Sequence, residues 1–191
     1  MAIYAVVLAA GTGRRFGGGK LLASYAGASV LEGALAAAVT APLAGVVLVT
    51  GARSDAVAAV ARRAFPAVRV IYAAEWAEGM AASLRAGIAA FPPNATGALV
   101  FLGDMPRVPV SILPLLVGAL KDGSPAAVPT FDGQFGHPVA FAASLFPDLA
   151  AITGDKGARG MLERLGEALV RIPAPDDGVL FDVDTRDDLT R

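Results

Sequence analysis

The stretch IYAVVLAAGTGRRFGGGK, residues 3–20, decides the fold of this chain. Its first part, Ile3 to Leu8, is almost continuously apolar, which is typical of a strand buried on both faces of a sheet. The second part is rich in glycine and carries Arg14, Arg15 and Lys20. Glycines allow backbone amides to approach a polyphosphate closely, and the cations neutralise its charge. A flexible surface loop with solvated charges is the alternative interpretation.

The rest of the first half alternates further apolar runs with helical stretches. The predicted strands are Ile3 to Leu8, Val46 to Thr50, Val68 to Tyr72 and Leu99 to Gly103. The predicted helices are Ser29 to Thr40, Ser54 to Phe65 and Gly79 to Phe91. Such alternation predicts right-handed βαβ units and hence a mainly parallel sheet.

The second half is less regular. We expect helices at Val110 to Lys121 and Gly157 to Leu165, and strands at Ala126 to Thr130, Pro138 to Phe141, Val170 to Ile172 and Val179 to Phe181. The strands on either side of the turn-rich segment 132–136 are expected to form a hairpin or an antiparallel addition to the sheet. The predicted fold is α/β and Rossmann-like, with three layers and a mixed, mainly parallel central sheet. Residues 1–191 are expected to form one domain.

Composition excludes several classes of function. The chain has a formal net charge of −1 and a pI near 5.8, which argues against a broad nucleic-acid interface. It contains no cysteine and one histidine, so thiol nucleophiles and multi-histidine metal sites are excluded. Any metal is therefore expected to be a hard cation held by carboxylates.

No segment predicts a membrane span or a secretory leader. The uncharged stretches 33–52 and 86–103 are interrupted by Pro42 and by Pro92-Pro93, and the N-terminus lacks a basic leader. We expect a cytoplasmic protein with no membrane partner.

The spacing of the loop glycines excludes two common phosphate-binding motifs. They follow G-x-G-x-x-x-G rather than the dinucleotide fingerprint, and Lys20 is followed by Leu21, so no Walker A motif is present. Residues 8–20 resemble instead the signature of the MobA-like nucleotidyltransferases, L-A-[AG]-G-x-[SG]-x-R-[MF]-G-x-x-K. The resemblance implies that Arg15 and Lys20 are catalytic and bind the β- and γ-phosphates. It implies a nucleotide-binding loop made of Leu8, Ala9, Ala10, Gly11, Thr12 and Gly13.

Two carboxylate motifs are candidates for a metal site. Asp104, in the segment GDMP, ends a predicted strand, where ligands gather in open α/β sheets. Its position alone also fits a turn or a helix cap, but the motif resembles the family's G-D-x-P metal-binding segment. Asp182 and Asp184 are expected to face one side of a strand, one completing the metal site and the other capping a short helix. The similar family segment implies that Asp182 is the second Mg²⁺ ligand.

Three further motifs are also similar to those of this family. Gly79 and Ser83, in GMAASL, open a helix and are implied to bind the nucleotide, although a plain helix start also explains them. His137 is implied to border the acceptor, while a structural role is the alternative. Lys156 and Arg159 are implied to grip the acceptor's phosphate, although solvated residues of a helix cap are the simpler explanation.

The closest resemblance is to the branch of molybdenum cofactor cytidylyltransferases. It implies a Mg²⁺-dependent transfer of CMP from CTP to a molybdopterin-type acceptor, with release of pyrophosphate and, as a further partner, a recipient molybdoenzyme. A guanylyltransferase or a sugar- or alcohol-phosphate nucleotidyltransferase remains open, because Gly13, Phe16 and Met105 depart from the usual pattern. An NAD(P)H-dependent oxidoreductase of the same fold and a non-catalytic chaperone are alternatives from other classes. The absent dinucleotide fingerprint argues against the first, and Asp104 with Lys20 argues against the second.

Overall fold

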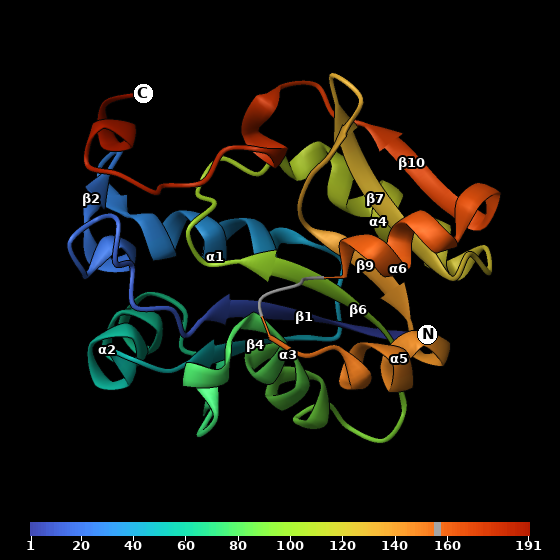
Figure 1. Cartoon of the computed structure of the whole chain (residues 1–191), viewed down its shortest axis with the longest axis horizontal. Helices are drawn as coiled ribbons and strands as arrows, with labels where there is room; N and C mark the ends of the chain where they lie inside the picture. The colour runs from blue at the N-terminus through green and yellow to red at the C-terminus, as the bar shows by residue number, and fades with distance from the viewer. Residues whose placement is uncertain (155–157) are drawn as a thin grey trace.

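The computed structural model describes residues 1–154 and 158–191 and is built around one large sheet (Figure 1). Within that described part, eight strands form the sheet, with a main order of β10-β7-β9-β6-β1-β4-β5 and with β8 paired to β7. The strands are β1 (Ala2–Ala9), β4 (Gly45–Thr50), β5 (Arg69–Tyr72), β6 (Ala95–Leu102), β7 (Ala126–Phe131), β8 (Gln134–Phe135), β9 (Val139–Ala142) and β10 (Leu169–Pro173). Two short strands, β2 (Ser24–Tyr25) and β3 (Ala28–Ser29), form a separate hairpin.

The pairing confirms the predicted mixed, mainly parallel sheet. Strand β1 pairs in parallel with β4 and β6, β4 with β5, and β7 with β10. Strand β9 is antiparallel to both β6 and β7, so the expected antiparallel addition is present. The carboxyl ends of β1, β4 and β6 therefore lie together at one edge, beside the glycine-rich loop.

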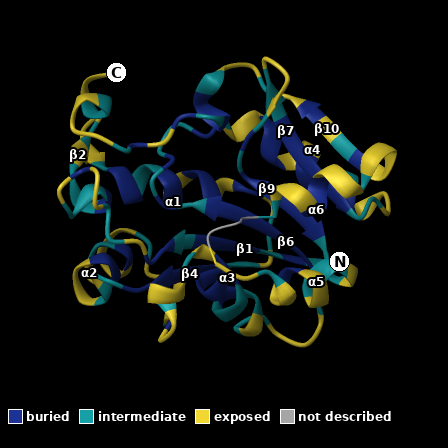
Figure 2. Ribbon diagram, in the orientation of Figure 1, coloured by how far each residue is buried: buried dark blue, intermediate teal, exposed yellow. Residues whose placement is uncertain are grey.

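Helices cover both faces of this sheet, because β1 buries apolar side chains on both of its faces. Ile3, Ala5 and Val7 belong to one apolar cluster, whereas Val6 belongs to another on the opposite face. The helices of the first cluster are α1 (Val30–Thr40), α2 (Ser54–Ala64) and α4 (Leu113–Lys121). Those of the second are α3 (Met80–Ala89), α5 (Phe146–Ala151) and α6 (Arg159–Arg164). Figure 2 shows the resulting pattern, with buried strands between helices whose outer sides are exposed.

Local sequence determines where α1 begins. The hydroxyl of Ser29 accepts a hydrogen bond from the backbone N–H of Glu32 at 3.2 Å, and the Glu32 carboxylate accepts from the Ser29 N–H at 2.7 Å. This reciprocal capping box satisfies donors that the first helical turn leaves unpaired. It fixes the helix that follows the glycine-rich loop.

One predicted strand, Val179 to Phe181, is wrong. Residues Asp177–Val179 form the 3₁₀ helix η6, and the Asp176 carboxylate accepts from the Gly178 N–H at 2.9 Å. This Asx-type bond turns the backbone before Val179, so no sheet ladder forms. The segment makes single backbone bonds instead, because the carbonyl of Val179 accepts from His137 N–H at 2.9 Å.

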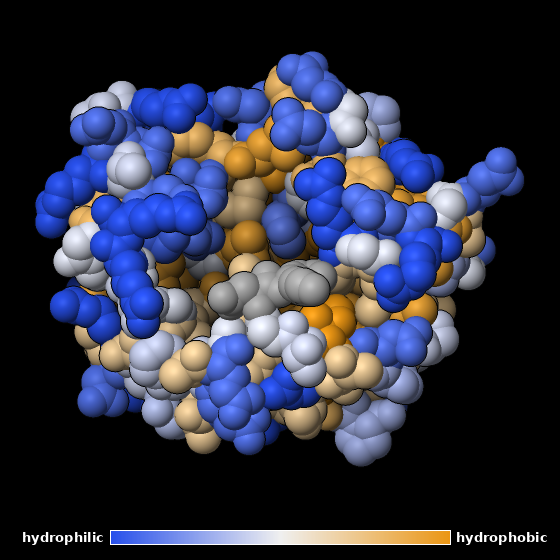
Figure 3. Space-filling model, viewed as in Figure 1, coloured by the Kyte–Doolittle hydropathy of each residue, from blue (hydrophilic) through white to orange (hydrophobic). Residues whose placement is uncertain are grey.

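The surface of one face is hollowed near its centre, with apolar side chains in the hollow and hydrophilic ones around it (Figure 3). Within residues 1–154 and 158–191, no helix has the length and apolar character needed to cross a bilayer.

Candidate active site

The glycine-rich loop is a compact turn rather than an extended segment. The backbone N–H groups of Phe16 and Gly18 both donate to the carbonyl of Gly13, at 3.1 and 3.0 Å. Gly13 has a φ of 65°, and a Cβ there would lie 3.2 Å from Cγ of Lys20. Glycine is therefore favoured at this position by both the backbone conformation and the close approach of Lys20.

Phe16 anchors this loop to the C-terminal segment of the chain. Its ring is buried in a cluster with Val30, Phe181 and Val183, and the guanidinium of Arg186 lies 5.1 Å from the ring centroid. These contacts hold residues 181–186 beside the loop. They explain how aspartates near the end of the chain reach the same site as Arg15 and Lys20.

Lys20 lies between two carboxylates. Its Nζ is 2.6 Å from Oδ2 of Asp104 and 3.3 Å from Oδ1 of Asp184. Arg15 Nη1 lies 2.7 Å from the other oxygen of Asp184. The Lys20 side chain is only 15% exposed, whereas that of Arg15 is 81% exposed. The structure thus brings together all three residues predicted to be catalytic, and adds Asp184.

The ionisation of this cluster follows from its charges. Burial alone lowers the pKa of the Lys20 ammonium, but Asp104 and Asp184 outweigh that effect and raise the pKa above its ordinary value. Burial acts to raise the pKa of Asp184, but hydrogen bonds from Arg15 and Lys20 bring that pKa below its ordinary value. Near neutral pH the cluster therefore contains the charged ammonium of Lys20 beside the charged carboxylate of Asp184.

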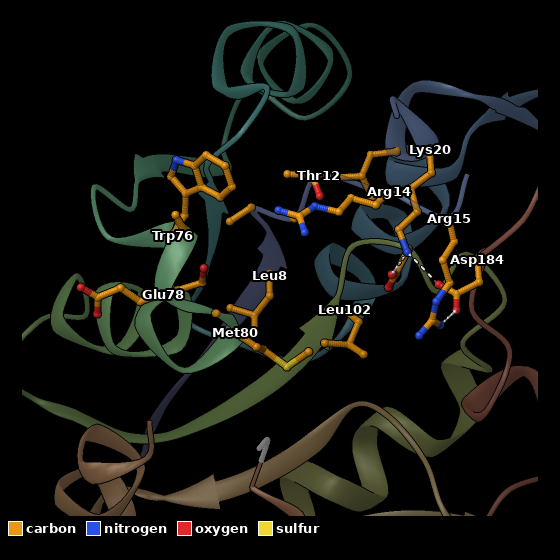
Figure 4. A pocket seen from close by; sticks show the side chains of 18 residues that line it. Leu8, Thr12, Arg14, Arg15, Lys20, Trp76, Glu78, Met80, Leu102 and Asp184 are labelled. Atoms are coloured by element: carbon orange, nitrogen blue, oxygen red, sulfur yellow. Dashed lines mark hydrogen bonds and ion pairs between the residues drawn. The ribbon is translucent and has the colours of Figure 1, made fainter. Parts of the chain in front are cut away.

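A cavity of about 520 Å³ opens over this cluster (Figure 4). Its lining includes ten of the residues predicted to form the site: Leu8, Ala10, Gly11, Thr12, Gly13, Arg15, Lys20, Gly79, Ser83 and Asp104. Ala9, which was also predicted, is buried in the core beneath them. Strand β1, the glycine-rich loop, the start of α3 and the end of β6 thus converge on one space of a size suited to a nucleotide.

The helix α3 contributes the opposite wall. Gly79 precedes the helix with a φ of 114°, a conformation that favours glycine, and Ser83 is 3% exposed. Trp76, from the short helix η2 (Trp76–Glu78), lines the same wall.

A second cavity of about 250 Å³ adjoins the first, and Leu8, Met80 and Leu102 line both. Its other walls are mostly apolar, but His137 and Arg159 also line it. Burial lowers the pKa of the His137 imidazole, although the Val100 carbonyl and the charge of Asp104 act in the opposite direction. His137 is therefore neutral near pH 7. Lys156, the other residue predicted to bind the acceptor, lies outside the described residues.

The predicted second metal ligand, Asp182, lines a different cavity, whereas Asp184 lines both that cavity and the 520 Å³ cavity. The alternation expected for the two aspartates holds, since Phe181 before them and Val183 between them are buried. Burial, then the negative charges of Asp104 and Asp184, raise the pKa of Asp182. The side chain of Asp184 does not cap the short terminal helix. Instead, the Asp188 carboxylate accepts hydrogen bonds from the backbone N–H groups of Asp184 and Thr185.

These carboxylates fit a hard divalent cation that retains water and takes oxygens from its substrate. Asp104 and Asp184 converge on the same ammonium, within 3.3 Å of Lys20 Nζ. Among the described residues, no three His, Cys, Asp or Glu side chains are grouped to hold a metal by themselves. Mg²⁺ is commonly bound by one or two carboxylates plus substrate phosphates, so such a donor set suits it.

Trp76 lines the cavity but was missed by the sequence interpretation, and Asp184 was considered for the metal site without being placed beside Lys20. The alternation of Phe181-Asp182-Val183-Asp184 was a signal that both aspartates face outward, but it does not tell which one reaches Lys20. Trp76 stands three residues before Gly79, and an isolated aromatic residue of this kind carries no motif of its own.

Residues 5–169 match the MobA-like NTP transferase domain family. The chain belongs to this family. The family resemblance inferred from residues 8–20 is therefore confirmed. Membership of this nucleotidyltransferase family supports an enzyme and implies a nucleoside triphosphate substrate.

Similar proteins carry diverse names. The MobA-like chain is 33% identical to the nicotine blue oxidoreductase of Paenarthrobacter nicotinovorans, over 99% of this chain and 95% of that protein. The crystal structure of Rv0371c from Mycobacterium tuberculosis H37Rv superposes with a TM-score of 0.87 at 32% identity, covering 100% of this chain and 97% of that one. The same mycobacterial protein has also been solved in complex with manganese, at a TM-score of 0.82 and 29% identity, with the same coverage.

Molybdopterin-guanine dinucleotide biosynthesis protein A from Archaeoglobus fulgidus has a TM-score of 0.72 at 25% identity, covering 98% of this chain and 95% of that one. These likenesses confirm the predicted fold class and support an enzyme of the nucleotidyltransferase type. The manganese complex indicates that a relative binds a divalent metal.

Proposed function

We propose that this protein transfers CMP from CTP to a molybdopterin-type molybdenum cofactor and releases pyrophosphate. The observation that carries the proposal is the pair of adjoining cavities, one charged and one mostly apolar, which share the walls Leu8, Met80 and Leu102. A triphosphate fits the charged cavity. The apolar cavity, beside the neutral His137, suits the ring system of an acceptor whose phosphate points towards the shared wall.

The reaction is an in-line displacement at the α-phosphorus. A phosphate oxygen of the acceptor forms the new P–O bond, and the bond from the α-phosphorus to the bridging oxygen of the β-phosphate breaks. A phosphate monoester is already anionic near neutral pH, so no strong general base is required. Positioning and electrostatic stabilisation are the expected sources of catalysis.

Lys20 and Arg15 bind the β- and γ-phosphates and stabilise the charge of departing pyrophosphate in this proposal. Lys20 is well placed because it is nearly buried and its pKa is raised, so it stays protonated. Its ammonium has three N–H donors, so it can bind a phosphate in addition to, or in exchange for, its contacts with Asp104 and Asp184. Leu8 to Gly13, Gly79 and Ser83 surround the nucleotide, while His137, Lys156 and Arg159 are proposed to contact the acceptor.

Mg²⁺ is the proposed metal, and it would neutralise charge on the α-phosphate and the acceptor. Asp104 would hold it together with one aspartate of the segment 182–184. Resemblance favours Asp182 for this second position, while the shared cavity with Asp104 supports Asp184. We further propose that residues 1–191 act as one domain, since Phe181 and Val183 pack against Phe16 of the loop. The proposed location of the protein is the cytoplasm.

The deciding experiment is an assay of pyrophosphate release with Mg²⁺, using CTP, GTP or ATP, with and without molybdenum-loaded molybdopterin. Acceptor-dependent release with CTP alone is the expected result. A preference for GTP would assign the chain to guanylyl transfer and contradict the choice of CTP. Release only with sugar or alcohol phosphates would overturn the acceptor, and no release at all would overturn nucleotidyl transfer.

One observation favours a second candidate, an oxidoreductase: a relative named as an oxidoreductase is 33% identical over 99% of the chain. NAD(P)H is the cofactor that we would test first. Thermal unfolding with NADPH or CTP separates the two. An increase in Tm with CTP but not with NADPH supports nucleotidyl transfer, whereas an increase with NADPH but not with CTP supports the oxidoreductase.

A further inference from the structure

The 520 Å³ cavity has two chemically different ends. Lys20, Arg15 and Asp184 form one end, and the indole of Trp76 lies on the other side of the cavity (Figure 4). If a triphosphate occupies the cations, as the proposed function requires, the remainder of the nucleotide extends towards the start of α3. Trp76 and its neighbours in η2 form the wall that this remainder meets.

The indole is held in place from behind. A Cβ on Gly51 would lie 2.7 Å from Trp76 Cγ and 2.6 Å from the carbonyl oxygen of Ala10, so Trp76 packs directly onto the backbone at the ends of β4 and β1. The Trp76 N–H donates to the carbonyl of Ala73 at 3.1 Å, and the Gly79 N–H donates to the carbonyl of Trp76 at 3.2 Å. The ring therefore reaches the cavity already positioned.

Further contacts fix the η2 segment to α3. Arg85 Nη2 lies 3.4 Å from the carboxylate of Glu75 and 3.5 Å from that of Glu78, the residues on either side of Trp76 and Ala77. The same guanidinium donates through Nη1 to the carbonyl of Ile152 at 3.1 Å. A preorganised aromatic wall loses little side-chain freedom when a ligand stacks on it.

Among the described residues that line this cavity, Trp76 is the one aromatic side chain. Indole is an apolar, flat surface, and it is chemically mismatched to the triphosphate and ribose. The complementary part of a nucleotide is its base, because every nucleobase has a π-face that stacks on aromatic rings.

We propose that Trp76 is the platform on which the nucleobase of the bound nucleoside triphosphate stacks. The inference rests on the proposed function only in taking a nucleoside triphosphate as the ligand, and it holds for any base. Stacking supplies affinity for a nucleoside and leaves the choice between bases to groups that contact the base edge. Trp76 thus distinguishes a nucleoside triphosphate from a bare polyphosphate.

Because the chain contains one tryptophan, fluorescence excited at wavelengths that tyrosine does not absorb reports on this position alone. The test is a titration of the full chain, with Mg²⁺, by CTP and separately by inorganic tripolyphosphate, corrected for nucleotide absorbance. CTP is expected to change Trp76 emission with a saturable curve, and tripolyphosphate is expected to bind without that change. Saturable CTP binding by calorimetry with unchanged emission would overturn the proposal.

Variants test the energetic contribution. Trp76→Leu is expected to weaken CTP binding about 10-fold to 100-fold, the range of measured base–aromatic stacking, with tripolyphosphate binding unchanged. Trp76→Phe should restore most of the CTP affinity. Tyr72→Leu is the matched control, because Tyr72 is an exposed aromatic residue at the end of β5 that does not line the cavity.

Equal CTP affinity in Trp76→Leu and the natural chain would overturn the proposal, as would parallel losses of CTP and tripolyphosphate binding. The proposed function fails in a different way. Normal emission changes with CTP but no pyrophosphate release with any acceptor would contradict nucleotidyl transfer and leave the stacking role standing. Normal turnover and a normal KM for CTP in Trp76→Leu would contradict the stacking role and leave nucleotidyl transfer standing.

Discussion

The ammonium of Lys20 lies 2.6 Å from Oδ2 of Asp104, although the two residues are far apart in the sequence and follow different strands. Lys20 follows the glycine-rich loop after β1, and Asp104 follows β6, the neighbouring parallel strand. The pair joins the proposed phosphate-binding cation to the proposed metal ligand. A phosphate and a metal ion would therefore compete with this ion pair for its two side chains.

Replacing Asp104 tests its proposed metal role. Asp104→Asn keeps the shape of the side chain but removes its charge, and we expect pyrophosphate release to fall at least ~100-fold, as when one electrostatic stabiliser is lost. The Tm should stay close to that of the natural chain, because the amide still fills the same space. Asp55→Asn, an exposed aspartate at the start of α2, is the control. Collapse of the fold or retained turnover would each count against the metal role.

Lys20 and Arg15 should differ in what their removal does to stability. Lys20→Met leaves Asp104 and Asp184 facing each other in a partly buried site, so we expect a loss of about 1–3 kcal/mol in the free energy of unfolding. Arg15→Met removes a side chain that is 81% exposed, and exposed pairs contribute little. Urea denaturation of both variants measures the difference, and pyrophosphate release should fall in both. Equal stability of the two variants would show that the Lys20 pairs contribute little to folding.

Metal affinity without nucleotide offers a separate measurement. The Lys20 ammonium repels a cation from Asp104 and occupies its oxygen, so Lys20→Met should bind Mn²⁺ more tightly than the natural chain does. Electron paramagnetic resonance of free Mn²⁺ gives the affinity directly. Weaker Mn²⁺ binding in this variant would show that Lys20 does not compete for the carboxylates. Asp104→Asn in the same assay should bind least.

Much of the fold could be predicted from near-continuous apolar runs, because strands covered on both faces must be apolar on both faces. The error at Val179 to Phe181 has a physical cause. Its backbone partners are the N–H of His137 for Val179 and the carbonyl of Asp104 for Val183, both remote in sequence. A local apolar pattern carries no information on such pairings.

The candidate site likewise has one part that a local motif predicts and another that depends on contacts between residues far apart in the sequence. Residues 8–20 carry a local motif, so Gly13, Arg15 and Lys20 could be assigned to the site from their resemblance to the family signature. The contact of Lys20 with Asp184 spans 164 positions and depends on Phe16, Phe181 and Val183 packing together. That packing is a tertiary property, whereas the preference for Asp182 as the metal ligand came from resemblance to the family segment.

His137 should make stability depend on pH. Its lowered pKa means that the folded chain binds a proton less readily than the unfolded chain, whose ordinary value is 6.5. This contribution is complete above pH 6.5 and is lost as the pH falls below it, by at most about 1.4 kcal/mol per pH unit. Denaturation curves between pH 7.5 and 5 should thus show a slope that His137→Asn reduces. An identical slope in both proteins would contradict a neutral imidazole whose pKa is lowered.

Gly51 should resist any added side chain. A Cβ there would meet Ala10 O at 2.6 Å and Trp76 Cγ at 2.7 Å, so Gly51→Ala must shift backbone or indole, and overpacking of this kind costs about 1–3 kcal/mol. CTP affinity should also fall, since the indole is displaced. Gly118→Ala is the matched control, because nothing lies within 4 Å of the added Cβ in α4. Alanine is favoured over glycine within a helix, so this control should gain about 0.5–1 kcal/mol in the free energy of unfolding and leave CTP affinity unchanged.

Calorimetry of CTP binding, together with urea denaturation, checks both variants. A stable Gly51→Ala with normal CTP affinity would show that the contact between Gly51 and Trp76 is loose.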